Sequence, residues 1–307
     1  MGERTGTPTG RNEGMIHAKK KWGALDNGIV IAVVLAGAYF TYRIQGSLHY
    51  QWNWAAIPQY LFRFDAELGR WIPNLLIEGL LTTLRLSIWS TVLATVIGTV
   101  MALLRISNSL FLRLAGGTYV GLVRNMPPLV LVFIFYYFIG DQLLPRMGID
   151  QWVQGLSQDA EATLRFLFGP LNLLVPFLSA LLTLALFEGA YITEIIRAGI
   201  LSIEKGQWEA ASALGMTPAE RMRHIILPQA IPRMLPPLAG QFISTIKDSA
   251  IVSVISIQEL TFQGMELMAS TYLTFEIWIT ITGLYLLLTL SFSLAVSALE
   301  SRLRIRA

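Results

Sequence analysis

The residues that could do chemistry in this 307-residue chain are few and widely spaced. Cysteine is absent, and histidine occurs only at His17, His49 and His224. This supply leaves no thiol nucleophile, disulfide framework or zinc cluster, because each of these needs such side chains close together. A membrane-embedded enzyme would need a nucleophile with a base, or a metal site, and almost nothing remains from which to assemble either. We therefore predict no catalytic residue and no metal site.

Several ionisable residues lie inside long apolar runs, among them Glu78, Arg85, Arg124, Glu188, Lys247 and Asp248. A charge in a membrane span costs about 2.5 to 3.5 kcal/mol on insertion scales, so such residues usually face protein or water and have partners. Lys247 lies about ten residues into its run, near mid-bilayer, where a zwitterionic solute would meet its charge. Alternatively, Lys247 pairs with an acid such as Glu188 and fixes helix packing. The candidates for the solute pathway or for intramembrane ion pairs are Glu188, Tyr191, Lys247 and Asp248.

The elements that position these residues must be apolar helices. The chain is 54% hydrophobic and only 14% charged, and its mean hydropathy is +0.55, whereas a soluble globular chain carries about 25% charged residues. This composition excludes a soluble domain, and its aliphatic content excludes a disordered chain. The small net charge of +3 gives nucleic-acid binding no support. We expect an all-α membrane protein.

Six apolar runs predict about six transmembrane helices. The first, residues 27–43, follows three lysines and lacks a small-residue cleavage pattern, so we interpret it as an uncleaved helix and not as a signal peptide. A span needs about 20 predominantly apolar residues. The other five runs cover residues 75–104, 118–139, 173–196, 235–257 and 277–299.

The basic residues set the expected orientation, because Lys and Arg that flank spans stay on the cytoplasmic side. With both termini inside, fifteen Lys and Arg fall in inner segments and only four in outer segments. We therefore expect cytoplasmic tails at residues 1–26 and 300–307, the latter basic. Residues 44–74 are rich in Trp and Tyr and are expected to lie at the periplasmic membrane interface. The polar segment 141–172 is expected to face solvent outside.

The most informative inner segment covers about residues 199–228. Strong helix formers over residues 207–214 predict a short helix, and Gly215 suits the left-handed position that ends one. Two short, stiff helices in this segment would transmit a push better than a flexible loop.

The start of the second short helix has its own signals. Thr217 offers an N-cap, Pro218 fits the first helical position, and Glu220 completes a capping box. Because proline interrupts the helical hydrogen bonds, we expect Pro228 to end this helix before the next span.

This segment resembles the EAA loop of ABC importer permeases. The matching residues are Glu209-Ala210-Ala211, Gly215 four residues later, and Ile226-Leu227-Pro228. Further matches make the chain similar to the polar amino acid permease family, which handles histidine, glutamine, glutamate or arginine. These are Lys205-Gly206-Gln207, Pro228-Gln229-Ala230, Ala190-Tyr191 with Glu194 and Arg197, and Lys247-Asp248. The resemblance covers roughly residues 75–299.

The resemblance implies a type I ABC importer permease fold over residues 75–299, preceded by an extra helix, in a multi-pass protein of the bacterial inner membrane. It also implies that the EAA loop forms a coupling helix seated on an ABC ATPase subunit, through Glu209, Ala210, Ala211 and Gly215. The chain has no phosphate-binding loop of its own. ATP and Mg would therefore be held by the ATPase, and this chain would bind no cofactor directly.

The implied function is inward movement of a polar amino acid by alternating access, driven by ATP hydrolysis on the partner. Other implied partners are a second permease subunit, identical or homologous, a periplasmic amino acid binding protein, and membrane lipid. Two alternatives stay open at this point. The chain could import another small polar solute, such as an opine or a modified amino acid, or it could be a passive scaffold for the ATPase.

Overall fold

The computed structural model describes residues 24–47, 50–67 and 69–304. The described chain divides into two units between Trp52 and Asn53. The first unit contains helix α1, Ala24–Ser47. This helix covers the predicted 27–43 helix and extends beyond it at both ends. Of the two predicted tails, residues 1–23 and 305–307 lie outside the described residues.

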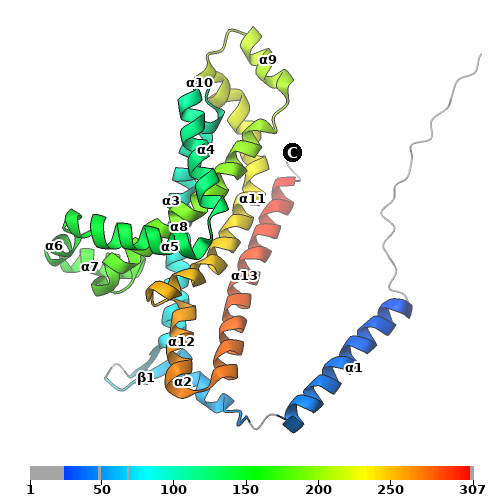
Figure 1. Ribbon diagram of the computed structural model, residues 1–307, viewed down its shortest axis with the longest axis vertical. Coiled ribbons are helices and arrows are strands. Elements are labelled where there is room, and N and C mark those ends of the chain that lie inside the picture. The colour runs from blue at the N-terminus through cyan, green and yellow to red at the C-terminus, as the bar shows by residue number, and fades with distance from the viewer. Residues whose placement is uncertain (1–23, 48–49, 68, 305–307) are drawn as a thin grey trace, which may run out of the picture. The chain divides into compact units, whose positions relative to one another are not determined.

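The second unit is a bundle of long helices with shorter helices at its ends and on one side (Figure 1). Its longer helices are α3 (Leu75–Ile106), α4 (Leu110–Asn125), α8 (Leu174–Leu201), α11 (Leu227–Asp248) and α13 (Thr274–Arg304). Its shorter helices are α2 (Ile57–Leu61), α5 (Pro128–Tyr136), α6 (Ile149–Gln154), α7 (Gln158–Phe168), α9 (Lys205–Ala213), α10 (Pro218–Arg221) and α12 (Leu260–Thr271). Helical turns of 3₁₀ type cover Trp54–Ala56, Pro145–Met147, Leu171–Leu173 and Ser249–Ile255, and π-helical turns cover Tyr137–Leu143 and Met222–Ile226.

Five helical stretches in the described residues are long and apolar enough to cross a membrane. They are Leu75–Ile106, Pro128–Met147, Leu171–Leu201, Pro218–Ile255 and Thr274–Ala298. Helix α1 contributes a shorter apolar stretch, Asp26–Tyr39. The predicted membrane protein of long apolar helices is therefore confirmed, with five long stretches and one short one where six spans were expected.

One small sheet departs from the all-α prediction. Strand β1 (Phe62–Asp65) pairs with β2 (Arg70–Pro73) in an antiparallel hairpin, with Phe62 opposite Pro73. The hairpin lies within the segment 44–74 that was predicted to be interfacial. The ring of Phe64 packs edge-on against Trp71 with centroids 5.7 Å apart, and this cross-strand aromatic pair stabilises the hairpin.

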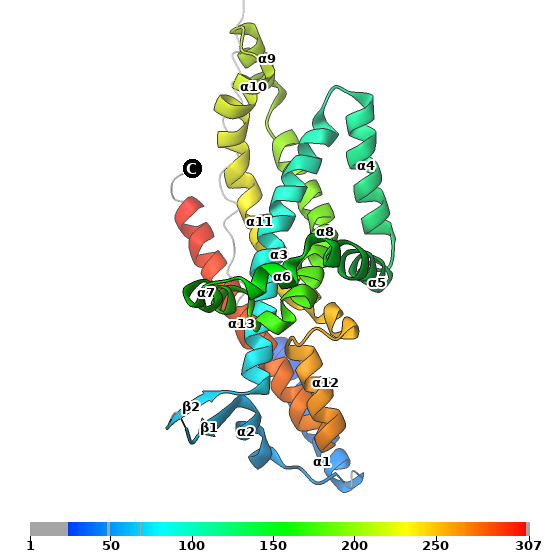
Figure 2. The ribbon, with the colours of Figure 1, turned by 90° about the vertical axis from the view of Figure 1, so that its left-hand side faces the viewer.

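The prediction of one uninterrupted span over residues 118–139 was wrong. The chain breaks at Met126 and Pro127, both extended, and α5 then runs across the direction of α4 (Figure 2). A proline disfavours the helical conformation of the residue before it, so Met126 cannot continue α4, while Pro128 is well suited to start α5.

The prediction that Pro228 ends a helix was also wrong. Helix α10, the π-helical turn Met222–Ile226 and α11 follow one another without a break, and Pro228 lies in the first turn of α11. A π-helical turn shifts the hydrogen bonds by one residue. Because this wider turn directly precedes Pro228, and because a first-turn proline need not donate, the ring is accommodated.

Close contact between α3 and α8 forms the centre of the bundle. Ala94, Gly98 and Ala102 repeat every four residues along α3 and are all buried. A Cβ atom at Gly98 would lie 2.7 Å from Cγ2 of Ile192. These small side chains let the two backbones approach closely, as is common between membrane helices. The polar groups of α8 are thereby held at fixed positions.

A buried carboxyl group ties together the end of the bundle that lies away from α9. Glu259 caps α12, because its carboxylate accepts hydrogen bonds from the backbone N–H groups of Thr261 and Phe262 at 2.9 and 2.8 Å. It also accepts bonds from the hydroxyls of Tyr285 on α13, at 2.9 Å, and Thr83 on α3, at 3.3 Å. One side chain thus joins three helices.

Candidate functional site

Helix α9 ends in a turn that requires glycine. Gly215 has φ +75, in the left-handed region, as predicted. The N–H of Met216 donates to the carbonyl of Ala211 at 3.2 Å, and the N–H of Gly215 to that of Ser212 at 3.0 Å, which is the Schellman pattern of helix ends. A Cβ at residue 215 would meet no atom within 4 Å. Backbone conformation, and not lack of space, therefore makes glycine necessary here.

The next helix begins with the predicted capping box. The hydroxyl of Thr217 accepts from the N–H of Glu220 at 3.3 Å, and the carboxylate of Glu220 accepts from the N–H of Thr217 at 2.9 Å. The chain therefore leaves α9 in a defined direction and enters α10 without a flexible link.

Side chains fasten α9 to the start of α11. The guanidinium of Arg221 lies 5.4 Å from the ring centre of Trp208 and contacts the hydroxyl of Ser212. The amide of Gln229 donates to the amide oxygen of Gln207 at 3.2 Å. Because these contacts join α9 to the long helix that follows it, a displacement of α9 would be transmitted along α11.

The outer face of α9 presents the predicted coupling residues. Glu209 and Ala210 are exposed, whereas Ala211 is only 2% exposed and faces the interior. Leu214, beside the glycine turn, is 80% exposed. Helix α9 lies at the tip of the bundle, at the opposite end from α12 (Figures 1 and 2). A projecting apolar side chain beside an exposed carboxylate on a braced helix is suited to protein contact.

Inside the bundle, Glu188 is fully buried on α8. Its Oε2 atom accepts a hydrogen bond from the amide of Gln241 on α11 at 2.6 Å. The half-buried carboxyl of Asp248 lies close enough to interact electrostatically with the same group. The Oε1 atom of Glu188 has no partner among the described residues. Of the four candidate pathway residues, the structure thus brings Glu188 and Asp248 together.

The hypothesis that Lys247 pairs with Glu188 was wrong. Lys247 is exposed, and it forms no ion pair within the part of the chain that the structure describes. Neighbouring residues on a helix point about 100° apart, so Lys247 and Asp248 cannot both face α8. Asp248 takes the inner position and Lys247 the outer one.

A second polar cluster surrounds Glu194, closer to the α9 end of α8. Its carboxylate pairs with Arg197 at 2.9 Å, as predicted, with Arg105 at the end of α3, and with Arg124 at the end of α4 at 4.0 Å. The guanidinium of Arg124 also lies 5.3 Å from the ring centre of Tyr191. The cluster therefore joins three helices and includes Tyr191. Among the described residues, Tyr191 forms no hydrogen bond with Glu188, Gln241 or Asp248.

The chain is also similar to known proteins. Residues 94–305 match the family described as binding-protein-dependent transport system inner membrane component. The chain belongs to this family. It is 34% identical over 230 residues to the probable glutamine ABC transporter permease protein GlnM of Bacillus subtilis, an alignment that covers 75% of this chain and 94% of that protein.

Two further likenesses cover similar lengths. The glutamine transport system permease protein GlnP of Escherichia coli is 35% identical over 231 residues, covering 75% of this permease and 94% of GlnP. The solved structure of an amino acid ABC transporter with histidines superposes with a TM-score of 0.63 at 31% identity, covering 82% of this permease and 100% of that chain. The predicted permease fold is therefore confirmed.

Family membership sets the coarse role of the chain. It is a multi-pass inner-membrane component of an ABC transporter, and a permease of this kind works with ATPase subunits and is not itself the catalytic one. The α9 residues of this permease were predicted from the sequence, and Arg124 was expected to have a partner, whereas the roles of Leu214 and Arg105 were not predicted. An apolar residue directly before the helix-ending Gly215 was a usable signal for Leu214. The convergence of Arg105 and Arg124 on Glu194 depends on helix packing and left no signal in the sequence.

Proposed function

We propose that this permease moves a polar amino acid into the cytoplasm by alternating access, driven by ATP hydrolysis on a partner subunit that contacts α9. The observation that carries the proposal is the braced helix α9, whose exposed Glu209, Ala210 and Leu214 lie at the tip of the bundle. A rigid projection fixed to α11 is what a separate motor subunit needs in order to act on the membrane helices.

The proposed assembly follows from what this chain lacks and what its family implies. ATP and Mg would bind to the ATPase, because the chain has no phosphate-binding loop. A second permease subunit would complete the pathway, and a periplasmic amino acid binding protein would deliver the solute. Both termini and α9 would be cytoplasmic, as the distribution of Lys and Arg favours.

The solute class is supported by the named relatives and by polar groups within the bundle. Glutamine appears in the names of both curated relatives. Glu188, Gln241 and Asp248 form a polar group in the bundle interior, and intramembrane ionisable groups commonly mark a solute path. An opine or a modified amino acid would carry the same ammonium and carboxylate groups, so it is the second candidate.

The test is ATP-dependent uptake by proteoliposomes that contain the permease, its ATPase and its binding protein. We expect uptake of at least one of L-glutamine, L-glutamate, L-histidine or L-arginine, and none when ATP is replaced by a non-hydrolysable analogue. Uptake of octopine with none of these four amino acids would favour the second candidate. A complete assembly that transports neither would contradict the proposal.

A further inference from the structure

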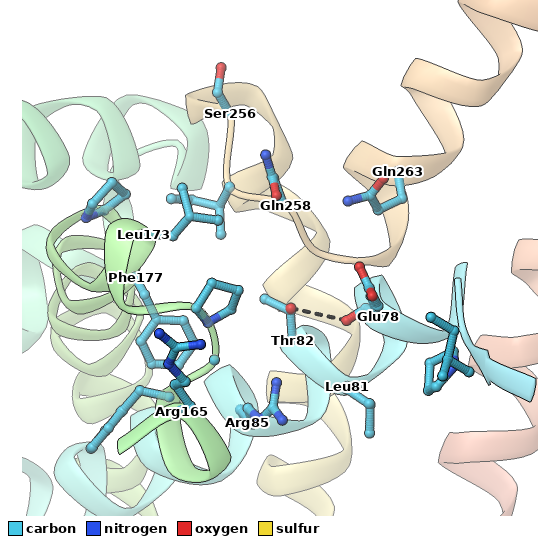
Figure 3. A pocket seen from close by; sticks show the side chains of 17 residues that line it. Glu78, Leu81, Thr82, Arg85, Arg165, Leu173, Phe177, Ser256, Gln258 and Gln263 are labelled. Carbon is cyan, nitrogen blue, oxygen red and sulfur yellow. Dashed lines mark hydrogen bonds between the residues drawn. The ribbon is translucent and has the colours of Figure 1, made fainter. Parts of the chain in front are cut away.

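A cavity of about 410 Å³ lies on the side of α3 near α7, and no residue of α9 lines it (Figure 3). Its walls come from the first half of α3, the end of α7, the start of α8, and the segment that leads from residue 256 into α12. This volume is in the range typical of small-molecule sites. The cavity contains neither Glu188 nor Glu194, so it is distinct from both polar clusters described above.

One wall carries a buried acceptor without a partner. Gln263 is only 4% exposed, and its Oε1 atom has no hydrogen-bond partner among the described residues. The side chain is held tightly, because a Cβ atom at Gly79 would lie 2.9 Å from its Cγ. Most buried polar atoms are paired. The unpaired amide oxygen of this cavity-lining side chain is therefore available to a donor that a ligand supplies.

An acid lies beside this amide. Glu78 lines the cavity on α3 next to Gly79, and its carboxylate has no hydrogen-bond or ion-pair partner among the described residues. The dashed line in Figure 3 joins the hydroxyl of Thr82 to the backbone carbonyl of Glu78, at 3.0 Å, and leaves the carboxylate uncommitted. A carboxylate and an amide oxygen at one end of a cavity suit an ammonium group.

The other end of the cavity is basic. Arg85 lies seven residues after Glu78, about two turns or ~10 Å further along the same face of α3. Its Nε donates to the carbonyl of Phe166 at 3.0 Å, which fixes the guanidinium while its two terminal nitrogens have no partner among the described residues. Arg165 also lines this end. A fixed guanidinium is a strong and directional receptor for a carboxylate.

Most of the remaining wall is apolar, and Leu81, Phe168, Leu173 and Phe177 contribute to it. Thr82, Ser256 and Gln258 add polar groups. The cavity thus has an anionic end, a cationic end and a largely apolar remaining wall. A solute with one charged group would leave the opposite end without a partner, whereas a zwitterion would satisfy both.

We propose that this cavity is a binding site for a zwitterionic α-amino acid, with Glu78 and Gln263 receiving the ammonium and Arg85 receiving the carboxylate. The proposal rests on the proposed function for its solute class. The site lies towards the end of the bundle where the binding protein would release the solute, so it would hold the solute before passage into the bundle.

The test is equilibrium binding of radiolabelled L-glutamine, L-glutamate and L-arginine to the purified permease–ATPase complex, without binding protein. We expect at least one of them to bind to the wild type, and both Glu78→Gln and Arg85→Gln to weaken that binding by about tenfold or more, since each removes a hydrogen bond to a charged group. The matched controls Glu266→Gln and Arg113→Gln change exposed charges outside the cavity and should bind as the wild type does.

Blocked competitors assign each end. The N-acetyl form of the bound amino acid lacks the ammonium, and its carboxamide form lacks the carboxylate. Both should compete at least about tenfold less well than the free amino acid for the wild type. Glu78→Gln should lose discrimination against the N-acetyl form only, and Arg85→Gln against the carboxamide only. The yield of each variant in size-exclusion chromatography shows whether it is folded. Arg165→Gln is a second variant at the basic end, and it leaves the hydrogen bond from Arg85 to the carbonyl of Phe166 intact.

Three results would overturn the site. They are absence of binding of all three amino acids to the wild type, unchanged binding by Glu78→Gln and Arg85→Gln, and loss of amino acid binding on adding phosphatidylethanolamine to phosphatidylcholine nanodiscs. The last result would mean that a lipid headgroup occupies the cavity.

ATP-driven uptake separates this proposal from the proposed function. If the wild-type complex imports amino acids but all cavity variants bind them normally, the proposed site is wrong and the proposed function still holds.

Discussion

The side-chain amide of Gln241 donates a hydrogen bond to the carboxyl group of Glu188 at 2.6 Å, and this bond joins α11 to α8 inside the bundle. Helix α11 also carries the contacts that hold α9, through Gln229 and the turn before it. The same helix therefore connects the exposed coupling surface to the buried polar group.

Replacing Gln241 with Leu should destabilise the bundle. The substitution removes the donor while the buried carboxyl of Glu188 remains, and an unsatisfied buried group costs about 1 to 3 kcal/mol. Thermal unfolding of the detergent-extracted complex should show a lower Tm for Gln241→Leu than for Gln158→Leu, which alters an exposed amide on α7. Equal Tm values for the two variants would show that the bond is not needed for stability.

Stability should also depend on pH through Glu259. Burial raises the pKa of its carboxyl to about 7, although four hydrogen bonds oppose the shift. The folded protein therefore keeps this proton at pH values where the unfolded chain, with a pKa near 4.5, has lost it. Stability from this group is fully present below about pH 4.5 and is lost as pH rises through 7.

The measurement is the Tm of the wild type and of Glu259→Gln from pH 5 to pH 8. Because Gln does not titrate, the Tm of the wild type should fall more steeply with rising pH than that of the variant. Glu266→Gln, which changes an exposed acid on α12, should keep the wild-type slope. Parallel curves for the wild type and Glu259→Gln would contradict the shifted pKa.

Gly98→Ala should loosen the contact between α3 and α8. The added Cβ would lie 2.7 Å from Cγ2 of Ile192 and 3.0 Å from the backbone nitrogen of Thr193, and overpacking of this kind costs about 1 to 3 kcal/mol. Gly117→Ala is the matched control, because a Cβ there meets no atom within 4 Å. We expect a lower Tm for Gly98→Ala only, and the packing account fails if both variants unfold at the wild-type temperature.

Orientation can be tested by single-cysteine labelling, since the chain contains no native cysteine. Asp159→Cys on α7 should react with a membrane-impermeant maleimide in intact cells. Asn108→Cys, in the turn between α3 and α4, should react only after the inner membrane is opened. The reverse pattern would invert the proposed topology.

The sequence was informative where a signal is local. Gly215, Thr217 and Glu220 sit in short motifs whose backbone geometry follows from the residues themselves, and each occupies its predicted position. The same local reasoning failed at Pro228, because a π-helical turn just before it changed the hydrogen-bond register. At Pro127 it failed because the apolar run continued through the helix break.

The sites depend on packing that the sequence does not display. Pairing of Glu188 with Lys247 was one of two hypotheses for Lys247, yet the rotation of α11 turns Gln241 and Asp248 towards Glu188 and Lys247 outwards. The cavity near Glu78 brings together residues more than 180 positions apart, such as Glu78 and Gln263. Nothing in hydropathy or charge spacing indicates that those two side chains share a wall.

The central claim, that α9 couples ATP hydrolysis to solute movement, is tested most directly by measuring ATP hydrolysed and amino acid imported in the same proteoliposomes. Glu209→Lys reverses an exposed charge on α9, and Gly215→Pro cannot adopt φ +75 because proline fixes φ near −65°. Both should insert at normal yield and abolish uptake, while Gly206→Ala, with free space and no left-handed backbone, should transport as the wild type does. The account would be contradicted if complexes with Glu209→Lys or Gly215→Pro imported as much amino acid per ATP hydrolysed as the wild-type complex does.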